Sequence, residues 1–229
     1  MRRNTLPVTA VLVVAILLAT SGGLNASPKP PVKFGLHVGA SLSSQWSPAE
    51  EISDFGRVTE FESGLCLGPF VTIPLGNWFA LQGELLFVER GAKHIITIAD
   101  FPYGDISVVY SLDYIDIPVL FTFIPIHGEH LRVYSHIGGH VSVLTAGTYA
   151  FSNEFIPDFS ETLSDLGGAD FGFTTGAGVE VQVEGLMLQL EYRYTMGFKD
   201  LTFPTGPEFP EIELRNMGHM ILLGIAFPL

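Results

Sequence analysis

The chain beyond residue 32 alternates apolar and polar residues in segments of about ten residues, separated by clusters of Gly, Pro, Asp and Asn. The clearest segment places Phe34, Leu36, Val38, Ala40 and Leu42 on one face, with glycine, histidine and serine on the other. A period of two is the repeat of a β-strand, whose successive side chains point to opposite faces. The same alternation recurs over residues 64–73, 81–90, 114–123, 131–143, 170–182, 186–196 and 218–227. The pattern therefore predicts eight strands.

The connectors between these segments alternate between short and long. The short ones are residues 75–78, 124–130 and 183–185, and the long ones are residues 45–62, 91–105, 145–168 and 198–215. Short turns at one end and long loops at the other are typical of an up-and-down outer-membrane barrel, whose long loops lie outside the cell. We therefore predict an all-β fold, an eight-stranded antiparallel transmembrane β-barrel over residues 33–229. Side chains nearly fill a barrel of that size.

A soluble lipocalin-like barrel would show the same period and the same number of strands. Such a barrel needs long charged side chains on its water-facing surface, yet the chain has four lysines, and only Lys33 lies at a strand. The apolar faces carry aromatic residues near their ends, as the interfacial girdles of membrane barrels do. They are Tyr192 and Tyr194 toward the long loops, Phe79, Phe123 and Phe227 toward the turns, and Trp78 in a turn. These features favour the membrane barrel.

The first 26 residues have the pattern of a secretory signal peptide. Arg2 and Arg3 precede an uncharged, mainly apolar run from residue 8 to residue 19, and small residues follow up to Ala26. The run is too short to span a bilayer as a helix. We expect cleavage after Ala26, with a cut after Gly22 or Gly23 as the alternative. A short N-terminal segment over residues 27–32 then follows, and the exported protein is expected in the cell outer membrane.

Charge and cysteine content exclude several classes of function. The net charge is −13, and removal of residues 1–26 leaves nine basic and 24 acidic side chains, a net charge of −15. Binding to nucleic acid is not expected, because it needs clustered Lys and Arg. Cys66 is the one cysteine, which excludes an intramolecular disulfide and a multi-cysteine zinc site.

The alternation turns a set of charged and histidine side chains toward the lumen. They are Glu84, Asp116, Arg132, His136, His140, Glu180, Glu191 and Arg193, and Arg90 is a further candidate. In a narrow interior such groups are expected to pair, because an unpaired buried charge costs several kcal/mol. One interpretation is a packed polar plug that fixes strand register. The other is a small selective pore lined by Glu84, Asp116 and Arg132.

Catalytic and metal chemistry are not expected in this lumen. His136 and His140 are four residues apart on one strand, which separates the two imidazoles by about 13 Å, too far to share a metal ion. Ser142 lies on the same face, but no nucleophile-elbow motif is present. We predict no enzyme activity, no catalytic residue, no cofactor and no metal site.

The long connectors are acidic and contain aromatic residues. Residues 44–62 carry a net charge of −4, and so do residues 145–168. Neither has the ligand spacing of an EF-hand calcium loop. These loops are either solvated anionic surface or a binding surface, and we expect contacts with outer-membrane lipid, with lipopolysaccharide and with a protein partner. The barrel itself is expected to be a monomer.

Several short motifs resemble those of a known family. They are Phe34-Gly35-Leu36, Gln82-Gly83-Glu84-Leu85, residues 112–120 with the run Tyr114-Ile115-Asp116-Ile117-Pro118, Gly138-Gly139 and residues 190–194. The sequence is similar over residues 33–229 to the outer-membrane β-barrel domain family common in Bacteroidetes, which includes PorT-like and porin-family small barrels. The resemblance implies a membrane barrel and little about activity. We expect a non-enzymatic protein that acts through its loops, and the alternative is a passive pore for small solutes or ions.

Overall fold

The computed structural model describes residues 30–46, 55–98, 106–128, 130–153, 156–162, 169–199, 201–202 and 213–229. The predicted signal peptide lies outside the described residues. The described residues form eleven strands: β1 (Lys33–Trp46), β2 (Phe55–Pro74), β3 (Phe79–Glu84), β4 (Leu86–Ile98), β5 (Ile106–His127), β6 (Leu131–Asn153), β7 (Ile156–Thr162), β8 (Ala169–Val183), β9 (Leu186–Gly197), β10 (Leu201–Thr202) and β11 (Glu213–Pro228). All their pairings are antiparallel. No helix among the described residues is long and apolar enough to cross a membrane.

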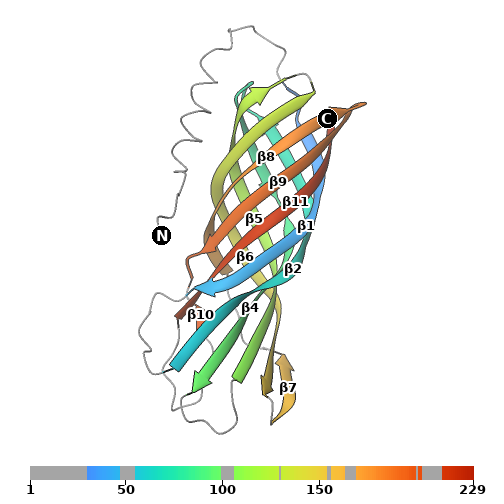
Figure 1. Ribbon diagram of the computed structural model, residues 1–229. Helices are drawn as coiled ribbons and strands as arrows, with labels where there is room; N and C mark the ends of the chain where they lie inside the picture. Colours follow the sequence, from blue (N-terminus) through green and yellow to red (C-terminus); the bar gives the residue numbers. More distant parts are fainter. Residues whose placement is uncertain are drawn as a thin grey trace, which may run out of the picture.

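The strands close into a ring (Figure 1), and their pairings give the ring eight strand positions. Going round it, β1 pairs with β2, β2 with β3 and β4, these two with β5, β5 with β6, β6 with β8, β8 with β9, β9 with β11, and β11 with β1. Strands β3 and β4 occupy one position and are separated only by Leu85. The predicted eight-stranded antiparallel barrel is confirmed.

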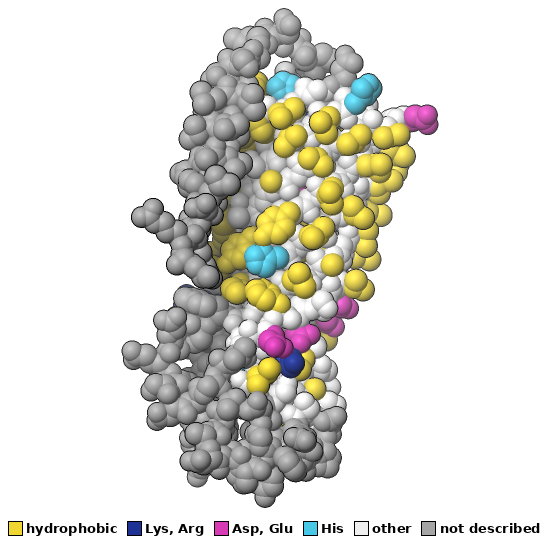
Figure 2. Space-filling model, viewed as in Figure 1, with side chains coloured by type: hydrophobic (Ala, Val, Ile, Leu, Met, Phe, Trp, Pro, Cys, Tyr) yellow, Lys and Arg dark blue, Asp and Glu magenta, His cyan; other side chains and the backbone are white. Residues whose placement is uncertain are grey.

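The two faces of each strand differ as the alternation predicts. In β1, Leu36 is 49% exposed on the outer face while its neighbour His37 is fully buried in the lumen. Apolar side chains form a broad outer belt over the barrel (Figure 2). In water such a surface would be a large apolar patch, and in a bilayer it meets acyl chains. Phe79 and Phe227 are exposed near the short turns, and Tyr192 is exposed nearer the other end.

The short connectors are turns at one end of the barrel, called here the short-turn end. They are residues 75–78, residues 184–185 and the connector between β5 and β6, of which Gly128 and His130 are described. Glu184 and Gly185 both have positive φ, 47° and 88°. That conformation makes a two-residue type I′ hairpin, which matches the twist of the strands on either side.

Much of what the sequence predicts as long loops is strand. Residues 55–62, 91–98 and 145–153 continue β2, β4 and β6, and residues 156–162 form the added strand β7 on β6. The prediction stopped the strands where the apolar face ends. The backbone pairing continues because it does not need an apolar face, and segments such as His94-Ile95-Ile96-Thr97-Ile98 are rich in β-branched residues.

These added residues form an extension of the barrel wall at the end opposite the short turns, defined here by residues 55–62, 91–98, 106–113, 145–153 and 156–162. The strands lie in the order β2-β4-β5-β6-β7 and project beyond the rest of the barrel (Figure 1). In this class of protein the end with short turns faces the periplasm. We therefore expect the extension to project to the outside of the cell.

Candidate functional site

The eight side chains predicted to face the lumen are placed there. Seven of them are buried: Glu84, Asp116, His136, His140, Glu180, Glu191 and Arg193. The Arg132 side chain is 23% exposed at the short-turn end. They do not form one cluster, because different partners hold them at three levels of the bore.

The central level holds one arginine between two glutamates. Arg193 donates from Nη1 and Nη2 to the carboxylate of Glu84 at 2.7 and 2.6 Å. Its Nε donates to Glu191. His37 lies 3.7 Å from Glu84, and His136 lies 3.5 Å from Glu191. One guanidinium therefore compensates two carboxylates in a site from which solvent is excluded.

The level at the short-turn end is centred on Glu180. Lys33 Nζ donates to both of its carboxylate oxygens at 2.6 Å. Arg132 Nη1 donates to Oε1 at 3.0 Å, and Gln189 Nε2 donates to Oε2 at 2.8 Å. Two cations share one carboxylate here, so this level carries a net positive charge.

The level nearest the extension is centred on Arg90. Its Nη2 is paired with Asp116, and its Nη1 donates to Ser142 Oγ at 3.2 Å. The guanidinium carbon also lies 5.0 Å from the centre of the Tyr114 ring, a cation–π contact. Asn216 donates to the Tyr114 hydroxyl at 3.0 Å. The sequence named Arg90 only as a further candidate, yet it is the partner of Asp116.

The pore interpretation required Glu84, Asp116 and Arg132 to line one path. Each of the three instead pairs with a different side chain, at a different level of the bore. Large side chains with at most 2% exposure fill the space between the ion pairs, among them Phe70, Leu86, Tyr114, Leu120 and Leu222. An apolar cluster of Cys66, Leu86, Val88, Met220 and Leu222 lies inside the barrel. This packing accords with the prediction that side chains fill the bore.

The histidines and Ser142 do not assemble a hydrolytic site. Ser142 accepts a hydrogen bond from Arg90, while His140 Nδ1 lies 2.8 Å from Thr174 Oγ1. His136 lies beside Glu191. Within the described part of the chain, no three His, Cys, Asp or Glu side chains gather closely enough to hold a metal ion.

Lys33 and His37 are buried lumen residues that sequence reasoning did not include in the site. The alternation along β1 indicates that both face the lumen, because residues 33, 35 and 37 fall on the face opposite Phe34 and Leu36. The sequence pattern places Lys33 only at the start of a strand. Its Nζ is instead paired with a glutamate 147 residues away in the sequence.

Acidic side chains lie on the outer surface where the apolar belt meets the extension (Figure 2). Asp113 is directly opposite Glu89 in the β4–β5 pair. Glu89 also accepts a hydrogen bond from the Leu65 amide at 2.9 Å, where the β2–β4 register shifts. Glu60 pairs with Lys93 at 3.0 Å. This band marks the outer border of the lipid-facing surface.

Among solved structures, the match to OprG supports the fold, and two further proteins match with lower scores. The outer membrane protein OprG from Pseudomonas aeruginosa is 12% identical, with 89% of this chain and 99% of that chain covered and a TM-score of 0.53. Ail, the attachment invasion locus protein of Yersinia pestis, is 13% identical over 86% of this chain and 99% of that one, with a TM-score of 0.40. The outer membrane protease OmpT from Escherichia coli is 6% identical over 92% of this chain and all of that one, with a TM-score of 0.43.

No curated protein matches the chain. A family model does match, that of the outer membrane protein beta-barrel domain, over residues 27–202. The match covers well over half of the chain and agrees with the closed ring of strands and the apolar outer belt. The protein is located in the outer membrane, and the chain belongs to the outer membrane protein beta-barrel domain family.

Proposed function

We propose that this barrel is closed to solutes and acts without catalysis, as a structural or interaction protein, through the extension and long connectors on its outer side. The filled bore carries the proposal: Arg193, Tyr114 and Phe70 are at most 2% exposed, and the central ion pairs occupy the space between them. A bore that is packed across its central level offers no continuous path for a solute. The surfaces outside the membrane are then the ones that can meet a partner.

The composition of the extension supports a role in contacts. Phe159 in β7 is 52% exposed, and its ring lies 6.2 Å from that of Tyr149 in β6. Exposed aromatic side chains are enriched at protein interfaces. We propose a protein partner for the extension. The acidic band below it borders the outer leaflet, where divalent cations could bridge carboxylates and lipopolysaccharide, and the belt contacts lipid.

Passive transport of small solutes or ions is the alternative. One observation favours transport: a cavity lies at the short-turn end of the lumen, bordered by Lys33 and Arg132. The central level lies beyond that cavity and is packed. Transport would therefore require the buried pairs of Arg193 to open.

Site-specific photo-crosslinking in cells tests the proposal. A photoreactive amino acid at Phe159 is expected to give a discrete adduct with another macromolecule, because this side chain projects from the extension. The matched control is Leu223, which is 58% exposed but lies in the apolar belt. We expect lipid adducts alone from that position. Adducts are resolved by electrophoresis and identified by mass spectrometry.

The outcome at Phe159 decides the interaction proposal. A discrete adduct that is absent at Leu223 supports it. If Phe159 and Leu223 give the same lipid adducts, and positions Phe61 and Tyr149 do so as well, the extension has no partner and the proposal fails.

We also propose that the chain belongs to the PorT-like small barrels of Bacteroidetes. The run Tyr114-Ile115-Asp116-Ile117-Pro118, followed by apolar alternation in β5, supports this assignment. Residues 1–26 are proposed to be a secretory signal, and the mature barrel is proposed to be a monomer.

A further inference from the structure

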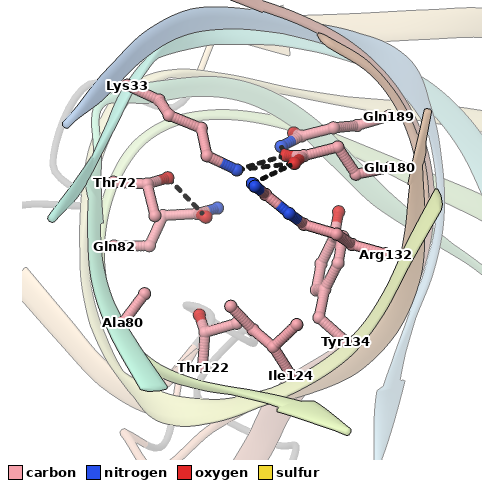
Figure 3. Close-up of a pocket in the computed structure, with 10 residues that line it drawn as sticks. All are labelled: Lys33, Thr72, Ala80, Gln82, Thr122, Ile124, Arg132, Tyr134, Glu180 and Gln189. Atoms are coloured by element: carbon pink, nitrogen blue, oxygen red, sulfur yellow. Dashed lines mark hydrogen bonds and ion pairs between the residues drawn. The ribbon is translucent and has the colours of Figure 1, made fainter. Parts of the chain in front are cut away.

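The lumen opens into a cavity at the short-turn end (Figure 3). About 310 Å³ of space not filled by protein atoms lies at this opening, with open solvent included in that volume. Lys33, Arg132, Glu180 and Gln189 form one wall. The opposite wall is made of smaller side chains, such as Ala80 and Thr122, so that an empty space remains between the two walls.

The charged wall has more hydrogen-bond donors than it uses. Glu180 accepts four hydrogen bonds from Lys33, Arg132 and Gln189, which fills the roughly four acceptor sites of a carboxylate. An ammonium has three N–H donors and a guanidinium has five. Lys33 uses two of its donors on Glu180 and Arg132 uses one. The remaining donors belong to two cations that share a single negative charge.

The opposite wall contributes a buried hydroxyl. Thr122 is 4% exposed, and its Oγ1 has no hydrogen-bond partner. In Figure 3 this oxygen points into the empty space, toward the charged wall. Buried polar atoms are ordinarily satisfied by protein, by water or by a ligand. The neighbouring acceptor, Gln82 Oε1, already receives the Thr72 hydroxyl at 3.0 Å.

We propose that this cavity binds a carboxylate that enters from the periplasmic side. An anion in the space between the walls would meet the spare donors of Lys33 and Arg132 on one side and the Thr122 hydroxyl on the other. Charge-assisted hydrogen bonds of this kind are the strongest that a protein offers to a carboxylate. Arg132 is the more exposed cation, 23% against 8% for Lys33, and it lies at the entrance. Because the bore beyond is packed, the carboxylate enters and leaves by the same opening.

The ligand is either a free small carboxylate or the carboxyl terminus of a peptide. The test uses the mature barrel refolded in detergent micelles, titrated with sodium acetate at constant ionic strength. Two-dimensional NMR follows the Arg132 Nε–H and the Thr122 amide. We expect saturable shifts at both positions. Arg132→Gln should weaken acetate binding at least about tenfold, the equivalent of one charge-assisted hydrogen bond.

Two further variants separate the site from a general effect of charge. Thr122→Val keeps the shape of the side chain and should also weaken binding. Lys93→Gln removes a cation in the extension, at the opposite end of the barrel from the cavity, and should leave acetate binding unchanged. Resistance to unfolding by sodium dodecyl sulfate without heating shows that each variant is folded.

Peptide ligands distinguish the two sources of the carboxylate. Binding of N-acetyl-alanyl-alanine as well as acetate would identify a peptide terminus, whereas binding of acetate alone would identify a small free carboxylate. The amidated peptide should not bind. The proposal is overturned if acetate gives no saturable shift, if Arg132→Gln and Thr122→Val bind acetate like the wild type, or if the amidated peptide binds as well as the free acid.

Discussion

Replacement of Arg193 by methionine is expected to destabilise the barrel by about 3–5 kcal/mol, the usual cost of breaking a buried ion pair by removing one partner. Arg193 is fully buried and binds both Glu84 and Glu191. Without it, Glu84 keeps a hydrogen bond from Gln82 and Glu191 keeps one from Tyr134, with His37 and His136 nearby, but the compensating guanidinium charge is lost. Urea unfolding of the barrel in lipid vesicles, followed by tryptophan fluorescence, measures the change.

A triple variant separates lost charge compensation from lost packing. Arg193→Met combined with Glu84→Gln and Glu191→Gln removes all three charges, and we expect it to recover a large part of the stability. A loss below about 1 kcal/mol for Arg193→Met alone would contradict the account, because that is the range of exposed ion pairs. The account would also be contradicted if the triple variant were no more stable than Arg193→Met alone.

Leu223→Arg is expected to lower the free energy of unfolding by about 2–4 kcal/mol. This is the range measured for arginine on the lipid face near the bilayer midplane. Leu223 is 58% exposed and lies near the middle of the outward-facing positions of β11. An arginine there would lie in hydrocarbon. The same unfolding experiment in vesicles gives the free energy.

Phe227→Arg is the matched control for the depth of the substituted residue in the bilayer. Phe227 is 47% exposed on the same face of β11, but it lies near the short-turn end. Arginine at the interface costs about 0–1 kcal/mol. Equal costs at Leu223 and Phe227, or no cost at Leu223, would contradict the assignment of the belt as the lipid-facing surface.

The barrel itself could be predicted because each strand carries its own signal. The alternation from Phe34 to Leu42 assigns every side chain of β1 to one of two faces, and that assignment also places His37 in the lumen. The even number of segments and the alternating connector lengths then give an up-and-down ring. Each of these signals lies within a short stretch of the chain, so a single sequence is enough to find them.

The partners of the buried charges could not be predicted in the same way. Arg193 and Glu84 are 109 residues apart and lie on strands that are not neighbours in the ring. Their contact depends on the stagger of all the strands between them, and alternation does not determine stagger. The extension was missed for a different reason. Its strands are held by backbone pairing and β-branched residues, without an apolar face to reveal them.

Single-channel conductance in planar bilayers tests the closed bore most directly. The wild-type barrel, Asp116→Asn and Arg132→Gln are compared after refolding, with correct folding shown first by heat-modifiable migration in electrophoresis. We predict no stable conductance steps for the wild type, because its lumen is filled by buried ion pairs and large side chains. Stable steps in the wild type whose size or ion selectivity changes with Asp116→Asn or Arg132→Gln would show that ions pass through the lumen, and would contradict the closed barrel.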